Sequence, residues 1–253
     1  MRVFAVSDLH VDYAINARWV DELSTFDYRD DVLILAGDVT HHLSQLAACL
    51  SAFVARFSKV LFVPGNHDLW IIGEGPNKTS LQKFAEVAAI VAASGASMQP
   101  FHRGGVTIAP LLGWYDYSFG EPGDELREMW MDYHACRWPV GFGPEQVATH
   151  FTSLNHQRPS DMATRVITFS HFMPRLDLLP AFIPRKHRVL DPVLGSTRLE
   201  SALRVLRSTL HVYGHSHINR RISLDGVTYV NNALGYPGEA GMTTRELLCV
   251  AEI

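Results

Sequence analysis

The stretch DVLILAGD, residues 31–38, shows how this chain is organised. Its four consecutive apolar residues, Val32 to Leu35, are typical of a strand that is covered on both faces, as in the sheets of α/β proteins. The stretch closes on Gly37-Asp38, a tight turn that places a carboxylate at the carboxyl end of the strand. An apolar strand followed by a polar cluster recurs along the chain, and this pattern predicts both the fold and the site.

Other apolar runs predict further strands, and helical patterns separate them. We predict strands at residues 2–7, 31–36, 59–63, 106–111, 165–170, 210–213 and 227–231. Apolar residues at helical spacing predict helices within residues 43–57 and 80–94. Thr197-x-x-Glu200 predicts a capping box at the start of a third helix. Strands that alternate with helices indicate an α/β architecture.

Bulk composition narrows the possible classes of protein. A length of 253 residues fits a single domain, 1–253, better than two. The content is 47% hydrophobic and 19% charged, as in ordinary globular proteins, and the net charge of −4 argues against binding to extended nucleic acid. No apolar run reaches the length of a membrane span. Three widely spaced cysteines predict reduced thiols, so we expect a cytoplasmic protein.

One segment, residues 114–142, lacks clear strand alternation. It holds eight aromatic residues, among them three of the five tryptophans of the chain. We expect an aromatic-rich insertion or lid over one end of the domain, with core packing and substrate stacking both open as its role. Trp114 and Tyr115 follow a predicted strand end, and we expect them to line the pocket.

Five polar clusters follow five of the predicted strands directly. The carboxyl ends of strands are where α/β sheets place their ligands, on loops held by a rigid scaffold. The clusters are Asp8-Leu9-His10, Gly37-Asp38, Gly65-Asn66-His67-Asp68, Ser170-His171 and Gly214-His215-Ser216-His217.

Together these clusters offer carboxylate, imidazole and amide donors but no thiolate. Such donors suit Mn²⁺, Fe or Zn²⁺ in an open site, and there are enough of them for two divalent ions. Two ions with only two carboxylates, Asp8 and Asp38, keep a positive charge that attracts a phosphate. Metal ions also make hydroxide available near neutral pH. The pattern predicts hydrolysis of an anionic ester.

The five clusters, in this order, resemble the motifs of the calcineurin-like metallophosphoesterase superfamily. The resemblance implies a four-layer sandwich of two mixed β-sheets flanked by α-helices. It also implies that Asp8, His10, Asp38 and His217 bind one ion, and that Asp38, Asn66, His171 and His215 bind the other. His67 would assist the departing oxygen, and Asp68 would orient the ring of His67.

The implied function is that of a binuclear, metal-dependent phosphoesterase. The expected substrate is a small phosphomonoester or phosphodiester, possibly a nucleotide, which a hydroxide bridging the two ions attacks in line. Mn²⁺ is the expected metal. A phosphoprotein phosphatase, a nuclease of the same fold and a non-catalytic binding scaffold stay open as alternatives. The basic run at residues 185–188 is either a solvated loop or a binding site for an acidic group of the substrate, through Arg185 and Arg188.

Overall fold

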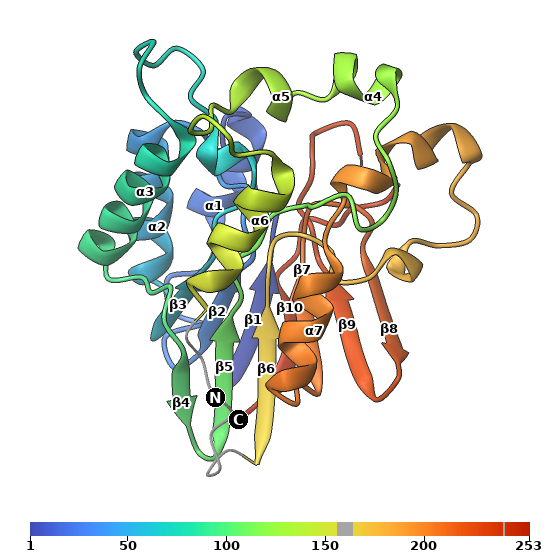
Figure 1. Ribbon diagram of the computed structural model, residues 1–253. Coiled ribbons are helices and arrows are strands. Elements are labelled where there is room, and N and C mark those ends of the chain that lie inside the picture. Colours follow the sequence, from blue (N-terminus) through green and yellow to red (C-terminus); the bar gives the residue numbers. More distant parts are fainter. Residues whose placement is uncertain (156–163, 240) are drawn as a thin grey trace.

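Two mixed β-sheets lie face to face at the centre of the molecule (Figure 1). The computed structural model describes residues 1–155, 164–239 and 241–253, apart from the side chain of residue 185. The first sheet has the strand order β10-β1-β2-β3. Its strands are Arg2–Val6 (β1), Val32–Leu35 (β2), Lys59–Phe62 (β3) and Leu248–Glu252 (β10).

The second sheet has the order β4-β5-β6-β7-β9-β8, with three parallel pairs at its centre and an antiparallel pair at each edge. Its strands are Phe101–Arg103 (β4), Val106–Pro110 (β5), Arg165–Phe169 (β6), Leu210–Tyr213 (β7), Arg220–Leu224 (β8) and Val227–Asn231 (β9). The predicted α/β sandwich of two mixed sheets is confirmed. All seven predicted strands are present, whereas β4, β8 and β10 were not expected.

Helices cover the outer face of each sheet. Side chains of Ala14–Glu22 (α1), Leu43–Val54 (α2) and Ser80–Ser94 (α3) pack on the first sheet. Pro144–Ser153 (α6) and Thr197–Val205 (α7) pack on the second. Two short helices, Asp124–Met129 (α4) and Asp132–Ala135 (α5), belong to the aromatic segment. The 3-10 helices are His67–Leu69 (η1), Leu176–Leu178 (η2) and Arg185–Val193 (η3).

The apolar strands are buried on both faces because each faces two layers. Leu33 and Leu35 of β2 point to the helices, whereas Val32 and Ile34 point to the second sheet. Successive strand residues face opposite sides, so a continuous apolar run is needed to fill both cores.

Helix ends follow local sequence, with one correction. Thr79 and Gln82 form a capping box at the start of α3, and Gly95, with φ of 88°, ends it. The capping box predicted at Thr197 is wrong. Ser196 caps α7 instead by accepting from the Arg198 N–H, and Glu200 accepts from the Tyr229 hydroxyl. The longest described helix, α3, has 15 residues, and none in the described ranges has the length and apolar character that a bilayer crossing requires.

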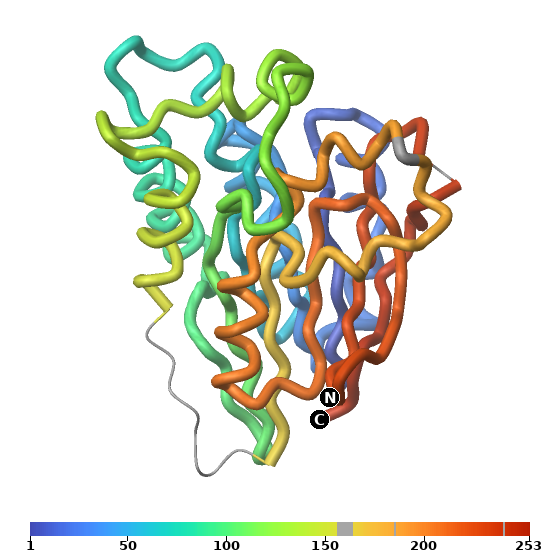
Figure 2. The backbone as a smooth tube through the Cα atoms, turned by 45° about the vertical axis from the view of Figure 1, so that its right-hand side comes forward, coloured from blue at the N-terminus to red at the C-terminus, as the bar shows by residue number. Residues whose placement is uncertain are grey.

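The parallel strands bring the loops at their carboxyl ends to one side of the molecule. β1, β2 and β3 run parallel in one sheet, and β5, β6, β7 and β9 in the other. The two chain termini lie at the opposite end, as the tube trace shows (Figure 2). Helices α4 and α5 lie across the top of the view, on the side of these loops (Figure 1).

Candidate metal centre

The first group of predicted ligands joins the loops after β1 and β7. Ligand atoms of Asp8, His10 and His217 lie within 4.8 Å of one another. The Nε2 atom of His217 is 3.2 Å from Asp8 Oδ1 and 3.2 Å from His10 Nε2. Asp8 and His10 are fully buried, so their donor atoms face one another rather than solvent.

The second group is centred on His171, which follows β6. Its Nε2 atom lies 3.1 Å from Asn66 Oδ1, 3.1 Å from His215 Nδ1 and 3.4 Å from Asp38 Oδ2. Asp38 also belongs to a set of ligand atoms with His10 and His67, so it stands between the two groups. The structure therefore brings all seven predicted ligands together from five loops.

The backbone at these positions is unusual. Five of the seven predicted ligands have φ between 44° and 67°, a region that residues other than glycine rarely adopt. Strain of this kind persists where surrounding structure enforces it, typically at functional sites. These five are Asp8, His10, Asp38, His215 and His217. The turn also requires glycine at position 37, because the Cβ of any other residue would lie 2.5 Å from His171 Nδ1.

The donor set fits divalent cations. Metal–donor bonds of about 2.0–2.2 Å separate neighbouring donors by roughly 3.0–3.5 Å, which is the spacing around His171 Nε2 and His217 Nε2. Burial and the nearby charges of Asp8 and Asp68 raise the pKa of Asp38. A cation at the centre would remove the cost of burying these carboxylates side by side. The buried His10 Nδ1 has no hydrogen-bond partner among the described residues.

Electrostatics prepare the histidines for this role. Burial lowers the pKa of His10 to about 3 and that of His215 to about 3, so both rings are neutral and can donate a lone pair. Burial also lowers the pKa of His217, but the carboxylates of Asp8 and Glu239 outweigh this effect and raise the pKa to about 10. In the metal-free protein the His217 ring is therefore protonated, and an ion that binds between Asp8 and His217 would displace this proton.

Outer contacts fix the orientation of the ligands. The Nδ1 atom of His171 lies 2.9 Å from the Ala36 carbonyl, and His215 Nε2 lies 3.0 Å from the Val193 carbonyl. His217 Nδ1 is 2.7 Å from Glu239 Oε2. Each partner holds a ring nitrogen so that the other one faces the centre.

The aromatic segment contributes Asp132 to the centre. This carboxylate is 2% exposed and accepts hydrogen bonds from Asn66 Nδ2 at 2.9 Å, from Trp70 Nε1 at 2.7 Å and from Trp130 Nε1 at 3.0 Å. Because the amide nitrogen of Asn66 is held by Asp132, its oxygen points to His171. Burial raises the pKa of Asp132 to about 6, although these hydrogen bonds oppose the effect.

The prediction that Trp114 and Tyr115 line the pocket is wrong. Their side chains are 1% and 2% exposed, and Trp114 packs among Trp138, Phe151 and Phe172. The physical reason is that aromatic side chains next to a strand end also fill the core between the second sheet and its helices. Trp114 packs in the core, whereas the Tyr115 hydroxyl also donates a hydrogen bond to Asp132.

The role predicted for Asp68 is also corrected. Its buried carboxylate accepts hydrogen bonds from backbone N–H groups of Asp38, Val39, Thr40 and Gly65, and it makes none with the His67 ring in the described part of the chain. Asp68 therefore ties the Gly37-Asp38 turn to the Gly65-Asn66 turn. The His67 ring instead stacks on Trp70 at 3.6 Å, and its Nε2 atom lies 3.3 Å from the Tyr236 hydroxyl.

Sequence reasoning missed Asp132, Tyr236 and Glu239. Tyr236 and Glu239 lie in the loop after β9, which begins Asn232-Ala233-Leu234-Gly235. Asn232 is a polar residue directly after a predicted strand, the signal that also marks the other five loops. Nothing comparable marks Asp132.

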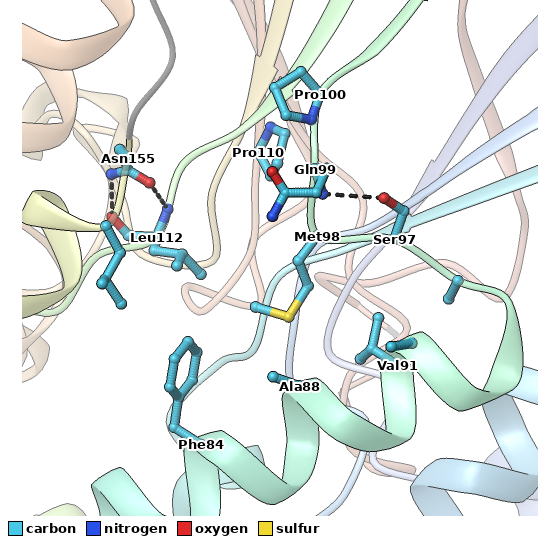
Figure 3. Close-up of a pocket in the computed structure, with 13 residues that line it drawn as sticks. Phe84, Ala88, Val91, Ser97, Met98, Gln99, Pro100, Pro110, Leu112 and Asn155 are labelled. Atoms are coloured by element: carbon cyan, nitrogen blue, oxygen red, sulfur yellow. Dashed lines mark hydrogen bonds between the residues drawn. The ribbon is translucent and has the colours of Figure 1, made fainter.

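Other candidate features lie apart from the seven ligands. Arg188 is 41% exposed and pairs with Asp191, so its contact with substrate stays a prediction, and the side chain of Arg185 lies outside the described residues. Asp12, His41 and His42 form a further, more exposed group of potential ligands. A groove of about 640 Å³ borders α3, where Phe84, Ala88 and Val91 face it, and no predicted site residue lines it (Figure 3).

Comparisons with known proteins agree with this geometry. A sequence model described as calcineurin-like phosphoesterase matches residues 1–219, which include all five clusters. The chain is 27% identical over 258 residues to the acyl-carrier-protein phosphodiesterase PptH of Mycobacterium tuberculosis, a match that covers 94% of this chain and 78% of that protein. The crystal structure of the phosphopantetheinyl hydrolase PptH from the same organism is similar with a TM-score of 0.78 at 24% identity. That similarity covers 94% of this chain and 90% of the other.

Proposed function

The chain belongs to the calcineurin-like phosphoesterases, metal-dependent hydrolases of phosphoric esters, and we propose that it cleaves the phosphodiester between a phosphopantetheinyl group and an acyl carrier protein. The observation that carries this choice of substrate is the similarity to PptH, which extends over 94% of the chain. The scissile group is a small diester, as expected from the sequence, but it is attached to a carrier protein. Such a partner is larger than the free small molecule expected at first.

The seven converging residues are the proposed metal ligands. Asp8, His10, Asp38 and His217 would hold one ion, and Asp38, Asn66, His171 and His215 the other. When bound, the two ions would neutralise charge on the phosphate and lower the pKa of a bound water. Oxygen and imidazole donors without thiolate suit Mn²⁺, and elemental analysis of the purified protein distinguishes it from Fe and Zn²⁺.

The protein's own side chains then perform the rest of the reaction. Water adds to phosphorus, and the ester oxygen departs with the bonding electron pair and takes up a proton. His67, which is 14% exposed and stacked on Trp70, is the proposed donor of that proton. Burial and the neighbouring histidine rings lower its pKa, so the ring would take up its proton only when the anionic substrate lies beside it. The stack restricts the ring to one orientation, which proton transfer in a defined direction requires.

The role of His67 can be tested by replacing it. We expect His67→Ala to lower turnover by roughly 10²–10⁴-fold, the usual contribution of a general acid, while metal content stays that of the parent protein. Turnover and metal stoichiometry are measured on the same preparation. Loss of metal in this variant would refute the assignment, because His67 would then be needed for the ions rather than for the leaving group.

The substrate can be tested directly. An acyl carrier protein bearing phosphopantetheine is incubated with the protein and Mn²⁺, and mass spectrometry follows release of the prosthetic group. Bis(p-nitrophenyl) phosphate serves as a generic diester in parallel. Cleavage of the generic diester with an intact carrier protein would reject the proposed substrate. Absence of both activities would reject the hydrolysis of phosphodiesters altogether.

A further inference from the structure

Tyr236 lies beside His67, the candidate general acid, and is not among the proposed metal ligands. Its hydroxyl oxygen lies 3.3 Å from His67 Nε2, and its ring stacks on His10 with centroids 4.4 Å apart and an interplanar angle of 26°. The rings of Tyr236 and His217 also pack in an edge-to-face arrangement, with their centroids 4.9 Å apart. One tyrosine thus touches two of the proposed ligands of the first ion and places a polar atom next to His67.

The backbone holds Tyr236 firmly in this position. The Gly235 N–H donates to the Asp8 carbonyl at 2.9 Å, and the fully buried Asn16 donates through Nδ2 to the carbonyls of Leu9 and Gly235. The loop after β9 is therefore fastened to the loop after β1. Gly235 has φ of 72°, and a Cβ there would lie 2.6 Å from Thr243 Cγ2, so the turn requires glycine.

A second anchor links Tyr236 to the first group of ligands. The Tyr236 N–H donates to Glu239 Oε2 at 2.8 Å, and the same oxygen is 2.7 Å from His217 Nδ1. The residue that orients a proposed ligand thus also orients the backbone of Tyr236. Such preorganisation is needed where a donor must meet charge that develops during a reaction.

We propose that Tyr236 is a catalytic residue whose hydroxyl donates a hydrogen bond to the departing ester oxygen, next to His67. This inference rests on the proposed hydrolysis of a phosphodiester and adds a second group at the leaving oxygen. When the phosphorus–oxygen bond breaks, its electron pair stays on that oxygen, which takes a proton from His67. The hydroxyl of Tyr236 keeps its proton throughout and stabilises the developing negative charge.

The test uses Tyr236→Phe and a pair of methyl aryl phosphodiesters that lose either phenol or p-nitrophenol. Phenolate keeps its charge on the departing oxygen, whereas p-nitrophenolate spreads it into the nitro group and needs less help. We expect kcat to fall about 100-fold for the phenyl ester but only about threefold for the p-nitrophenyl ester, as for loss of one oxyanion donor. Metal content and melting temperature should match the parent protein.

Tyr13→Phe is the matched control. Tyr13 packs against the edge of Tyr236 at 5.7 Å, is 46% exposed, and its hydroxyl makes no hydrogen bond with a described residue. This variant should retain parent activity on both esters. Equal losses on both esters in Tyr236→Phe, or no loss, would overturn the proposal.

A second measurement separates contact with substrate from positioning of His67. Tyr236→Phe is combined with His67→Ala, and the phenyl ester is assayed. If Tyr236 touches the leaving oxygen, the second substitution lowers the residual rate further. If the rate of His67→Ala is unchanged by it, Tyr236 acts only through His67 and the proposal fails. A parent protein that cleaves neither aryl ester and releases no phosphopantetheine from the carrier protein rejects the proposed function itself, and the role of Tyr236 with it.

Discussion

The two halves of the candidate metal centre are held by different kinds of contact. In the first half, His217 is oriented by Glu239, a carboxylate that is 25% exposed and lies on the loop after β9. In the second half, His171 and His215 are oriented by the backbone carbonyls of Ala36 and Val193. Asn66 is oriented there by Asp132, which is 2% exposed.

This difference separates an adaptable half from a rigid one. Water can replace a partly exposed carboxylate as the partner of an imidazole, whereas a buried donor that loses its partner pays the full cost of desolvation. Substitutions in the supports of the second half should therefore weaken metal binding more than those in the first. Metal affinities of variants in the two sets of supports test this order.

The largest effect is expected for Asp132→Asn. Both carboxylate oxygens accept hydrogen bonds, from Asn66 and Trp70 on one side and from Trp130 on the other, so an amide must point its NH₂ group at a donor in either orientation. We expect affinity for the ion at the second half to fall about 100-fold. Titration of the metal-free protein with Mn²⁺, monitored by calorimetry, should show one weakened site and one unchanged site.

Asp116→Asn controls for the loss of a carboxylate from the same aromatic segment. Asp116 accepts from Ser196 and pairs with Arg198, away from the seven ligands. The Asp116→Asn variant should bind Mn²⁺ at both sites with the affinity of the parent protein. Two intact sites in Asp132→Asn would show that the orientation of Asn66 does not depend on this buried carboxylate, and the comparison between the halves would fail.

A smaller effect is expected for Glu239→Gln. The glutamine oxygen can still accept from His217 Nδ1, so only the charge is lost, at a position that water reaches. Affinity for the ion at the first half should fall about 10-fold, the lower end of the range for residues that orient a ligand. The same calorimetric titration measures it. A loss as large as that in Asp132→Asn would mean that the two halves are equally rigid.

The sequence predicts the centre well because the sheets determine where its loops lie. Asp8, Asp38 and Asn66 follow β1, β2 and β3, and parallel pairing of these strands brings their carboxyl ends together. In the second sheet, the parallel pairing of β6 with β7 likewise places His171 next to His215. A polar residue directly after a buried strand therefore predicts its own location, whatever its distance along the chain.

The supporting residues were harder to predict, because their position depends on packing far from any strand. Asp132 lies 66 residues from Asn66, in a segment whose aromatic composition does not reveal which side chains turn inward. Trp114 and Tyr115 illustrate the same difficulty, since they follow a strand end and yet fill the core. Tyr236 could have been found, because the strand that precedes it was predicted.

The smallest effect on turnover is expected for His211→Gln, one layer behind the second half. His211 is fully buried on β7, with Nδ1 2.8 Å from Thr168 Oγ1 and Nε2 3.0 Å from Ser170 Oγ, next to His171. Burial lowers its pKa to about 3, from an unfolded value near 6.5. Between these pH values the unfolded chain binds a proton that the folded protein does not, so stability falls as pH drops from about 6.5 towards 3.

A glutamine at this position can still bond to Ser170 but does not titrate. The free energy of unfolding of the metal-free variant, measured with urea, should therefore depend less on pH below about 6.5 than that of the parent protein. Turnover at neutral pH should stay within about threefold of the parent value. His102→Gln, which replaces an exposed histidine on the edge strand β4, is the matched control and is unfolded under the same conditions. An unaltered slope in His211→Gln would mean that His211 takes up a proton below about pH 6.5 in the folded protein as it does in the unfolded chain. The rigid half would then rest on a charged group, as the first half does through Glu239.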